Sequence, residues 1–326
     1  MKTVGLFFGG LGNEKEISII SAKNIVKNFD YKKYKLKLIY WHTDGFFYLI
    51  KDINKINFKS KILPEKFKKI FDIAFLITHG KYGEDGSLQG LFEILKIKYC
   101  GCRVLSSSLC MDKAVFKIFI AGQKIPQVKF KVLDFYRQSE KEIEKAKKEI
   151  KKEMKLPIFV KPSNSGSSVG ITKVTKWDSL NKAIKESFKY DSKVLIEEGL
   201  INPKEVEVAV LGNDNLTVSI PGELKLSKDF YDYDDKYKKG EAKQIIPADI
   251  SEKAKKEIKY LAEKVYRLSD CRGFARVDFF MYKNKIYLNE INTLPGFTDI
   301  SMYPMLMQNM GLKYKELLNI IIELAY

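Results

Sequence analysis

The chain has 326 residues, enough for two or three domains, and its 45% hydrophobic and 13% aromatic content indicates a folded globular protein. It holds no apolar run near the roughly 18 residues that span a bilayer, and its short apolar start lacks a secretory cleavage pattern. We therefore expect a soluble, cytoplasmic protein with no membrane partner.

The net charge of +17 raises the hypothesis of nucleic-acid binding. Only five of the 58 basic residues are arginine, and the lysines are scattered along the chain and mixed with acids. Nucleic-acid sites usually cluster both cations with exposed stacking aromatics. A lysine-rich surface explains the charge at least as well, so we do not expect nucleic acid to be a partner.

The cysteines do not form a zinc pattern. Cys100 and Cys102 have the wrong spacing for a paired knuckle, Cys110 and Cys271 stand apart, and only two histidines exist to complete a site. Reduced, buried thiols are expected.

The first part of the chain alternates strand and helix. Thr3–Phe8, Leu36–Trp41 and Ile73–Thr78 are apolar runs with helical spacing between them, which predicts a parallel sheet covered by helices. Ligands of such sheets bind beyond the carboxyl ends of the strands, so Gly9–Glu16 and His79–Gly86 are the expected site loops. The glycines do not match a dinucleotide fingerprint.

The middle of the chain combines a charged helix with a glycine-bearing loop. Ser139–Met154 reads as a solvated helix with an apolar stripe and a Glu144–Lys148 pair at i,i+4. Ile158–Pro162 reads as a strand that carries Lys161, and Ser163–Gly170 follows it. Such a loop can wrap phosphate oxygens with amides and hydroxyls, although a plain flexible turn is equally consistent with it.

An acidic cluster follows the next expected strand. Glu197, Glu198 and Glu205 are acceptors that can bind an adenine amino group and ribose hydroxyls. Taken alone, such a cluster is more often surface charge.

The run from Gly273 to Pro304 is the most informative part of the sequence. Arg276 and Asp278 are two apart on one β-rich run, and Glu290 and Asn292 are two apart on the next. Side chains at i and i+2 share one face of a strand, so a hairpin would bring all four together. Carboxylate and amide oxygens suit Mg²⁺, and a cation beside it suggests phosphoryl chemistry. An ordinary hairpin with a polar face is the alternative.

Taken together, these motifs resemble the D-alanine–D-alanine ligase family of the ATP-grasp fold, over essentially the whole chain. The matching segments, in the family's order, are Gly9-Gly10 with Glu14–Ser18, His79–Gly86 with Gln89-Gly90, Cys110–Lys113, Lys161–Gly170, Phe230–Tyr237 and Gly273–Pro304.

The resemblance implies three α/β domains, with a Rossmann-like amino-terminal substrate domain. The expected bounds are residues 1–102, 103–197 and 198–326, with ATP between the last two. It implies ATP- and Mg²⁺-dependent ligation of two D-alanines through an acylphosphate, for peptidoglycan precursors. It also implies two metal ions, replaceable by Mn²⁺, and a homodimer.

The resemblance implies roles for residues that match the family motifs. Asp278, Glu290 and Asn292 are expected to bind the metal. Arg276 and the Gly296 amide are expected to form an oxyanion hole. The nucleotide is assigned to Lys113, Lys161, Ser168 and Lys236, with Glu197 at adenine, Glu205 at ribose and Glu198 as an alternative to either.

For the amino-acid substrates, the resemblance implies a hydrogen-bonded set of Glu14, Ser167 and Tyr237, with His79, Ser301 and Met302 binding substrate. Tyr237, next to Lys236 on a mobile loop, favours D-alanine as second substrate. A depsipeptide ligase that uses D-lactate, and another ATP-grasp carboxylate–amine ligase, are the alternatives.

Overall fold

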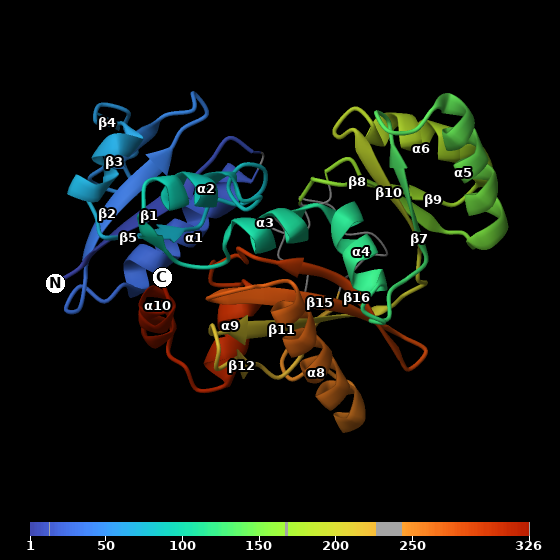
Figure 1. The fold of residues 1–326 in the computed structure, drawn as a ribbon. Coiled ribbons are helices and arrows are strands. Elements are labelled where there is room, and N and C mark those ends of the chain that lie inside the picture. Colours follow the sequence, from blue (N-terminus) through green and yellow to red (C-terminus); the bar gives the residue numbers. More distant parts are fainter. Residues whose placement is uncertain (13, 167–168, 226–242, 326) are drawn as a thin grey trace.

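The computed structural model describes residues 1–12, 14–166, 169–225 and 243–325. Three sheets organise these residues, each with helices packed against it (Figure 1). The α/β prediction is confirmed.

The amino-terminal sheet has the strand order β4-β3-β2-β1-β5-β6. The central strand β1 pairs in parallel with both β2 and β5, as the apolar runs predicted. The carboxyl ends of β1 and β5 therefore open on the same edge of the sheet. The elements are β1 (Thr3–Gly9), α1 (Lys15–Asn28), β2 (Lys35–Trp41), β3 (Phe47–Ile50), β4 (Lys61–Ile62), η1 (Pro64–Lys69), β5 (Ile73–Leu76), α2 (Ser87–Ile94) and β6 (Lys98–Tyr99).

Two short helices, α3 (Val104–Met111) and α4 (Lys113–Ala121), follow this sheet. Phe116 and Ile120 of α4 are buried in the same apolar cluster as the strands of the third sheet. The same helix contacts β10 (Lys193–Glu198) of the second sheet. In Figure 1, α3 and α4 run between the three sheets.

The second sheet is antiparallel, with the order β7-β10-β8-β9. Helix α5 is capped by Ser139, whose side chain forms a capping box with Glu142, so the predicted helix is confirmed. The expected pair of Glu144 with Lys148 is replaced by a pair of Glu144 with Lys147. Both lysines lie on the helix face of Glu144, because neighbours at i+3 and i+4 share a face. The elements are β7 (Phe130–Asp134), α5 (Glu140–Glu153), β8 (Ile158–Pro162), β9 (Thr172–Val174), η2 (Trp177–Ser179), α6 (Leu180–Ser187) and β10 (Lys193–Glu198).

The third sheet has the order β14-β13-β11-β15-β16, with β12 on β11. The predicted hairpin is confirmed as β15 and β16, joined by Lys283 and Asn284, both at positive φ as in a two-residue turn. A bulge follows Asp278. The elements are β11 (Lys204–Leu211), β12 (Thr217–Val218), β13 (Gly222–Lys225), β14 (Lys243–Ile245), α8 (Glu252–Leu268), β15 (Phe274–Tyr282) and β16 (Lys285–Asn292).

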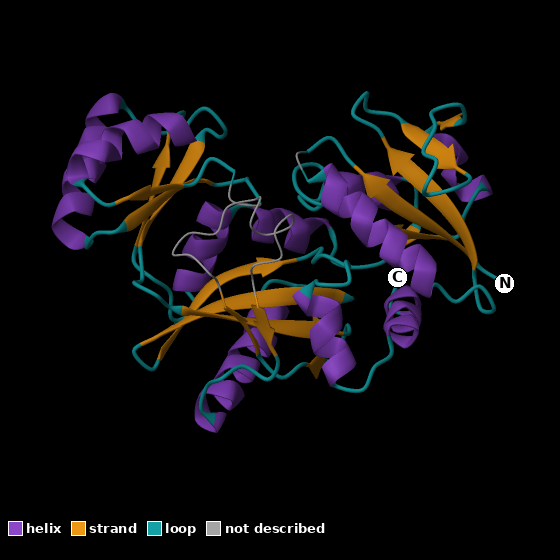
Figure 2. Cartoon of the chain, turned by 180° about the vertical axis from the view of Figure 1, so that it is seen from behind, coloured by secondary structure: helices purple, strands orange, loops and turns teal. Residues whose placement is uncertain are grey.

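The last two helices, α9 (Met302–Asn309) and α10 (Tyr314–Glu323), pack against the amino-terminal part of the chain. Their buried side chains share one apolar cluster with the amino-terminal strands. Asn24 Nδ2 donates to the Phe297 carbonyl at 2.9 Å, and Asn319 Nδ2 donates to Asp30 at 3.0 Å. The view from behind shows the C-terminus beside the amino-terminal sheet (Figure 2).

The cysteines and the search for membrane spans bear on two further expectations. All four cysteines are free and buried, as predicted, and burial raises the pKa of the Cys271 thiol well above its ordinary value. Within the described ranges, no helix has the length and apolar character that crossing a bilayer requires.

Candidate active site

A cavity of about 700 Å³ lies where the three sheets meet. It is lined by both loops expected beyond the amino-terminal strands, by β8 and β10, and by the hairpin. Predicted site residues in its lining are Glu14, His79, Lys113, Lys161, Glu197, Glu198, Glu205, Arg276, Glu290, Asn292 and Gly296. The fold thus brings together residues that are up to 282 positions apart in the sequence (14 to 296).

The Glu14 carboxylate lies against two glycines, Gly80 and Gly166, which belong to different loops. A Cβ at Gly80 would lie 2.5 Å from Glu14 Oε2, and one at Gly166 would lie 2.6 Å from the same oxygen. Glycine at both positions therefore lets two backbones approach the carboxylate. Gly166 belongs to the loop after β8, so this contact joins the amino-terminal domain to the candidate phosphate loop.

His79 is buried, with 7% of its surface exposed. Burial lowers the pKa of its imidazole, and Glu14 opposes that effect only in part. The neutral ring donates from Nδ1 to the Leu294 carbonyl at 3.0 Å, because a carbonyl can only accept. Nε2 is then an acceptor, and it has no hydrogen-bond partner among the described residues.

Lys113 is the first residue of α4. Its Nζ lies 3.1 Å from Oε2 of Glu290 in the hairpin. Glu84, in the His79–Gly86 loop, lies close enough to Lys113 and Glu290 to feel their charges. Burial and the neighbouring Glu14 raise the pKa of the Glu84 carboxyl to about 8, although Lys113 opposes this. The cavity therefore holds one carboxyl group that stays protonated at neutral pH.

Glu197 of β10 lies between two lysines, Lys117 of α4 and Lys161 of β8. Its carboxylate is 3% exposed, pairs with Lys161 and lies 2.6 Å from Lys117 Nζ. Burial alone would raise the pKa of this carboxyl, but the two ammonium groups lower it to about 2. Glu197 is therefore ionised and can only accept hydrogen bonds.

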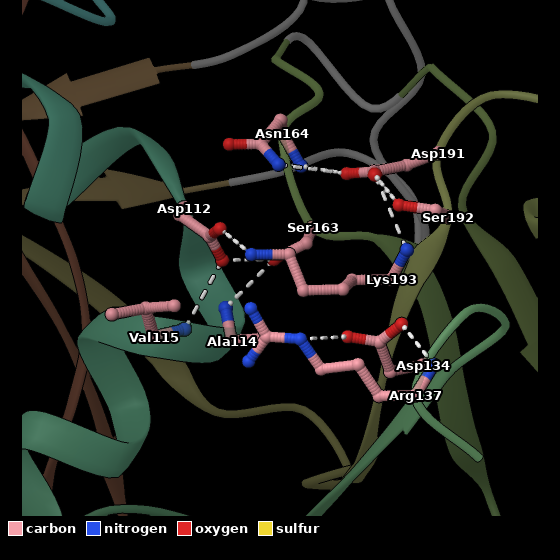
Figure 3. A network of polar contacts seen from close by, with 10 residues as sticks. All are labelled: Asp112, Ala114, Val115, Asp134, Arg137, Ser163, Asn164, Asp191, Ser192 and Lys193. Carbon is pink, nitrogen blue, oxygen red and sulfur yellow. Dashed lines mark hydrogen bonds and ion pairs between the residues drawn. The ribbon is translucent and has the colours of Figure 1, made fainter.

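A polar network fixes the loop after β8 against α4 (Figure 3). Asp112 caps α4 by accepting from the Val115 amide at 3.1 Å, and it also accepts from Ser163 Oγ and pairs with Lys193. Ser163 in turn accepts from the Ala114 amide at 3.0 Å. The first residue of the candidate phosphate loop and the helix that carries Lys113 therefore share one set of contacts.

The hairpin places its four predicted residues as two cross-strand pairs, Arg276 with Asn292 and Asp278 with Glu290. Arg276 makes two hydrogen bonds to Asp278, at 2.8 and 2.7 Å, and its Nε lies 3.0 Å from Glu207. Asn292 Nδ2 donates to Asp278 at 2.8 Å.

These residues fit a magnesium site that is completed by ligand oxygens. Asp278 and Glu290 supply two carboxylates and Asn292 an amide, and cationic groups already lie against both acids. Among the described residues, no cluster of three or more His, Cys, Asp or Glu side chains can hold a metal alone. Mg²⁺ bound here would take its remaining oxygens from phosphate and water.

Gly296, Ser301 and Met302 follow the hairpin. Ser301 Oγ accepts from the Thr298 amide at 3.0 Å and lies so close to Gly296 that a Cβ there would be 2.8 Å from it. The Met302 side chain is buried in the core and does not line the cavity.

The acidic residues near β10 and β11 differ in their surroundings. Glu198 accepts from the Lys155 amide at 2.8 Å, which fixes its carboxylate at the cavity wall. Glu205 lies on β11, opposite Leu224 of β13. Ser167, Ser168, Lys236 and Tyr237 were also predicted as site residues and lie outside the described residues.

Sequence reasoning missed Glu84, Lys117 and Glu207. Glu207 was detectable, because Glu205 and Glu207 alternate with valines on a strand just as Arg276 and Asp278 do. Lys117 follows Lys113 by four positions, the spacing of neighbours on one helix face. Glu84 stands within a predicted site loop, but its raised pKa depends on burial that only the fold supplies.

Comparisons with known proteins agree with this geometry. The family described as D-ala D-ala ligase N-terminus matches residues 3–102, and D-ala D-ala ligase C-terminus matches residues 119–323. A D-alanine–D-alanine ligase of Caldicellulosiruptor bescii is 43% identical over 99% of this chain and 94% of its own length. One from Clostridium acetobutylicum is 42% identical over 99% of this chain and 98% of its own length.

Solved structures show the same architecture. The VanG D-Ala:D-Ser ligase from Enterococcus faecalis superposes with a TM-score of 0.88 at 35% identity, covering 99% of each chain. The D-alanine–D-alanine ligase from Coxiella burnetii gives 0.83 at 34% identity, covering 100% of this chain and 95% of its own. The fold is thus the ATP-grasp fold, and the chain belongs to the D-alanine–D-alanine ligase family.

Proposed function

We propose that this protein joins two D-alanines into D-alanyl-D-alanine, with ATP converted to ADP and phosphate, for peptidoglycan precursors. The observation that carries the proposal is one cavity lined by Glu14, by Lys113 of α4 and Lys161 of β8, and by Arg276, Glu290 and Asn292 of the hairpin. It combines a carboxylate for an amino-acid ammonium, cations for phosphates and acids for a metal.

In the first step, a carboxylate oxygen of the first D-alanine attacks the γ-phosphorus of ATP and ADP leaves. Lys113 and Lys161 neutralise the phosphates, and Glu14 holds the ammonium of the substrate. Glu197 accepts from the adenine amino group. Glu205 is assigned to ribose by family resemblance, with Glu198 as the alternative. Lys236 and Ser168 are assigned to the phosphates by family resemblance.

Asp278, Glu290 and Asn292 would hold two magnesium ions, with Mn²⁺ as a substitute. The bound metal supplies positive charge that orients the phosphates and stabilises the transferring group. Lys113 lies against Glu290, and Arg276 against Asp278, so each acid keeps a protein cation beside the phosphates.

In the second step, the amine of the second D-alanine attacks the acylphosphate carbonyl, a peptide bond forms and phosphate leaves. Arg276 and the Gly296 amide stabilise the oxyanion. Ser301, at the start of α9, binds the carboxylate of the second substrate, where the helix end favours an anion. His79 Nε2 accepts from a substrate N–H, while Ser167 and Tyr237 are assigned to the Glu14 set.

The identity of the second substrate is the point on which relatives differ. One similar structure is described as a D-Ala:D-Ser ligase. A depsipeptide ligase using D-lactate remains the alternative from sequence. Tyr237, in place of a histidine, supports D-alanine.

The test is ADP formation by the purified protein with ATP and Mg²⁺, given D-alanine alone or with D-serine or D-lactate, with products resolved by mass. D-Alanyl-D-alanine as the main product is expected. Preferential formation of the mixed dipeptide or the depsipeptide at neutral pH would replace this substrate assignment. Absence of D-alanine-dependent ADP from folded protein would favour another carboxylate–amine ligase.

The protein is further proposed to form a homodimer. Three consecutive helices, α2, α3 and α4, expose large apolar side chains, with Ile94 at 80%, Leu105 at 63% and Ile118 at 57% exposure. A second copy that covers this face would remove the apolar surface from water.

A further inference from the structure

Lys117 is a charged side chain buried behind the cavity wall, with 2% of its surface exposed. It lies one helical turn after Lys113, so both lysines project from the same face of α4. Lys113 reaches Glu290 of the hairpin at 3.1 Å, whereas Lys117 reaches Glu197 of β10 at 2.6 Å. Helix α4 therefore pairs one lysine with an acid of the hairpin and the other with an acid of β10.

The two lysines that share Glu197 are not equivalent. Lys161 lines the cavity and can turn to a bound phosphate, whereas Lys117 does not line it. Among the described residues, Glu197 is the one acid within ion-pair distance of Lys117 Nζ. A buried ammonium group without its counter-ion is costly, so the Lys117–Glu197 contact persists when Lys161 leaves.

We propose that Lys117 is a positioning residue for nucleotide recognition, because it fixes Glu197 as an ionised hydrogen-bond acceptor and so releases Lys161 to the phosphates. The inference rests on the proposed function, in which Glu197 accepts from adenine. A carboxylate matches a base with an exocyclic amino group, and it opposes a base with a carbonyl in that place, because neither group then donates. Lys117 thereby contributes to base choice without touching the base.

The experiment measures direct binding of ATP and of inosine triphosphate by calorimetry, in the absence of D-alanine. Lys117→Met removes the charge at nearly constant shape, and Lys131→Met, which breaks an ion pair with Glu149 away from the cavity, is the matched control. Lys117→Met is expected to bind ATP about tenfold more weakly and to lose most of its preference for ATP. Lys131→Met is expected to bind as the unmodified protein does.

Two outcomes separate this inference from the proposed function. An unmodified protein that binds no ATP would refute the proposed function. An unmodified protein that binds ATP, with equal affinity and equal base preference in Lys117→Met, would refute the role of Lys117 alone. In turnover, the KM for ATP should rise in Lys117→Met while the KM for D-alanine stays unchanged.

A second comparison applies even where Lys117→Met folds poorly. The double variant Lys117→Met/Glu197→Gln, in which neither side chain is charged, is compared with Glu197→Gln. Because Lys117 acts through Glu197, the two are expected to bind ATP equally. A further loss of affinity in the double variant would contradict the inference.

Discussion

At the scale of single residues, the cavity is a set of charges that hold one another in place. Arg276 lies between the carboxylates of Asp278 and Glu207, so its guanidinium is oriented before any substrate binds. An oxyanion donor is effective when it is positioned in advance, since no reorganisation is then needed during the reaction.

Arg276→Ala is expected to lower kcat by about 10²–10³, the usual loss for one oxyanion donor. The measurement is steady-state ADP formation, with thermal unfolding to verify that the variant folds. Arg272→Ala is the control, because Arg272 pairs with the exposed Asp214 outside the cavity. A kcat for Arg276→Ala equal to that of the control would contradict the assignment.

Glu84 gives a prediction on pH. Its carboxyl has a pKa of about 8 in the folded chain against an ordinary value of 4.5, because of burial and then the charge of Glu14. Between pH 4.5 and about 8 this carboxyl is protonated in the folded chain and ionised in the unfolded chain, so unfolding releases a proton. The free energy of unfolding therefore falls as pH rises through this range, by at most about 1.4 kcal/mol per pH unit. Glu84→Gln removes this slope.

Urea unfolding of Glu84→Gln at pH 5 and pH 8, without nucleotide or metal, measures the effect. The free energy of unfolding of the variant, relative to the unmodified protein, is expected to increase from the lower pH to the higher. Glu65→Gln, at an exposed position, is expected to show no such trend. Parallel pH dependence of Glu84→Gln and the unmodified protein would count against a protonated Glu84.

At the scale of elements, helix α4 and the loop after β8 act as one unit. Asp112 caps the helix, and the same carboxylate binds Ser163 and Lys193 from the second sheet (Figure 3). The Asp112 side chain thus fixes both the start of helix α4, at Lys113, and the start of the candidate phosphate loop, at Ser163.

Asp112→Ala is expected to lower the free energy of unfolding by about 1 kcal/mol through loss of the cap, and also to weaken ATP binding. Ser251→Ala removes the cap of α8, where Ser251 accepts from the Ala254 amide at 3.3 Å, and serves as the matched control. Calorimetric unfolding and nucleotide titration separate the two effects. Equal ATP affinity in both variants would show that Asp112 is a helix cap only.

At the scale of the whole molecule, the two ends of the chain pack together, and three consecutive helices expose large apolar side chains. Helices α9 and α10 pack in the core of the amino-terminal sheet, so the first and last segments of the chain are stabilised together. The apolar side chains on α2, α3 and α4 lie outside both large apolar clusters or at their margins.

Leu105→Asp is expected to convert a dimer into a monomer without loss of folding, because the side chain is 63% exposed. Size-exclusion chromatography with light scattering measures the mass. Tyr260→Asp changes an equally exposed apolar side chain, 64% exposed on α8, and is expected to leave the mass unchanged. The same mass for both variants would place the interface elsewhere.

The sequence alone determined the elements whose signals are local. Apolar runs with helical spacing between them predicted the parallel strands, and two β-rich runs predicted the hairpin. A spacing of two placed Arg276 with Asp278, and Glu290 with Asn292, on one face. Family motifs predicted the fold, while the domain bounds and the roles of the site residues remain predictions.

Tertiary structure alone decided what depends on distance and burial. Lys117 and Glu197 are 80 residues apart (117 to 197), and only the docking of α4 on β10 makes them an ion pair. The raised pKa of Glu84 follows from loss of water and from a charge on another loop, neither of which a local pattern encodes. Local sequence determines the periodicity of helices and strands and the positions of turns. The ion pairs and pKa values in the cavity depend on neighbours that meet only in the folded chain.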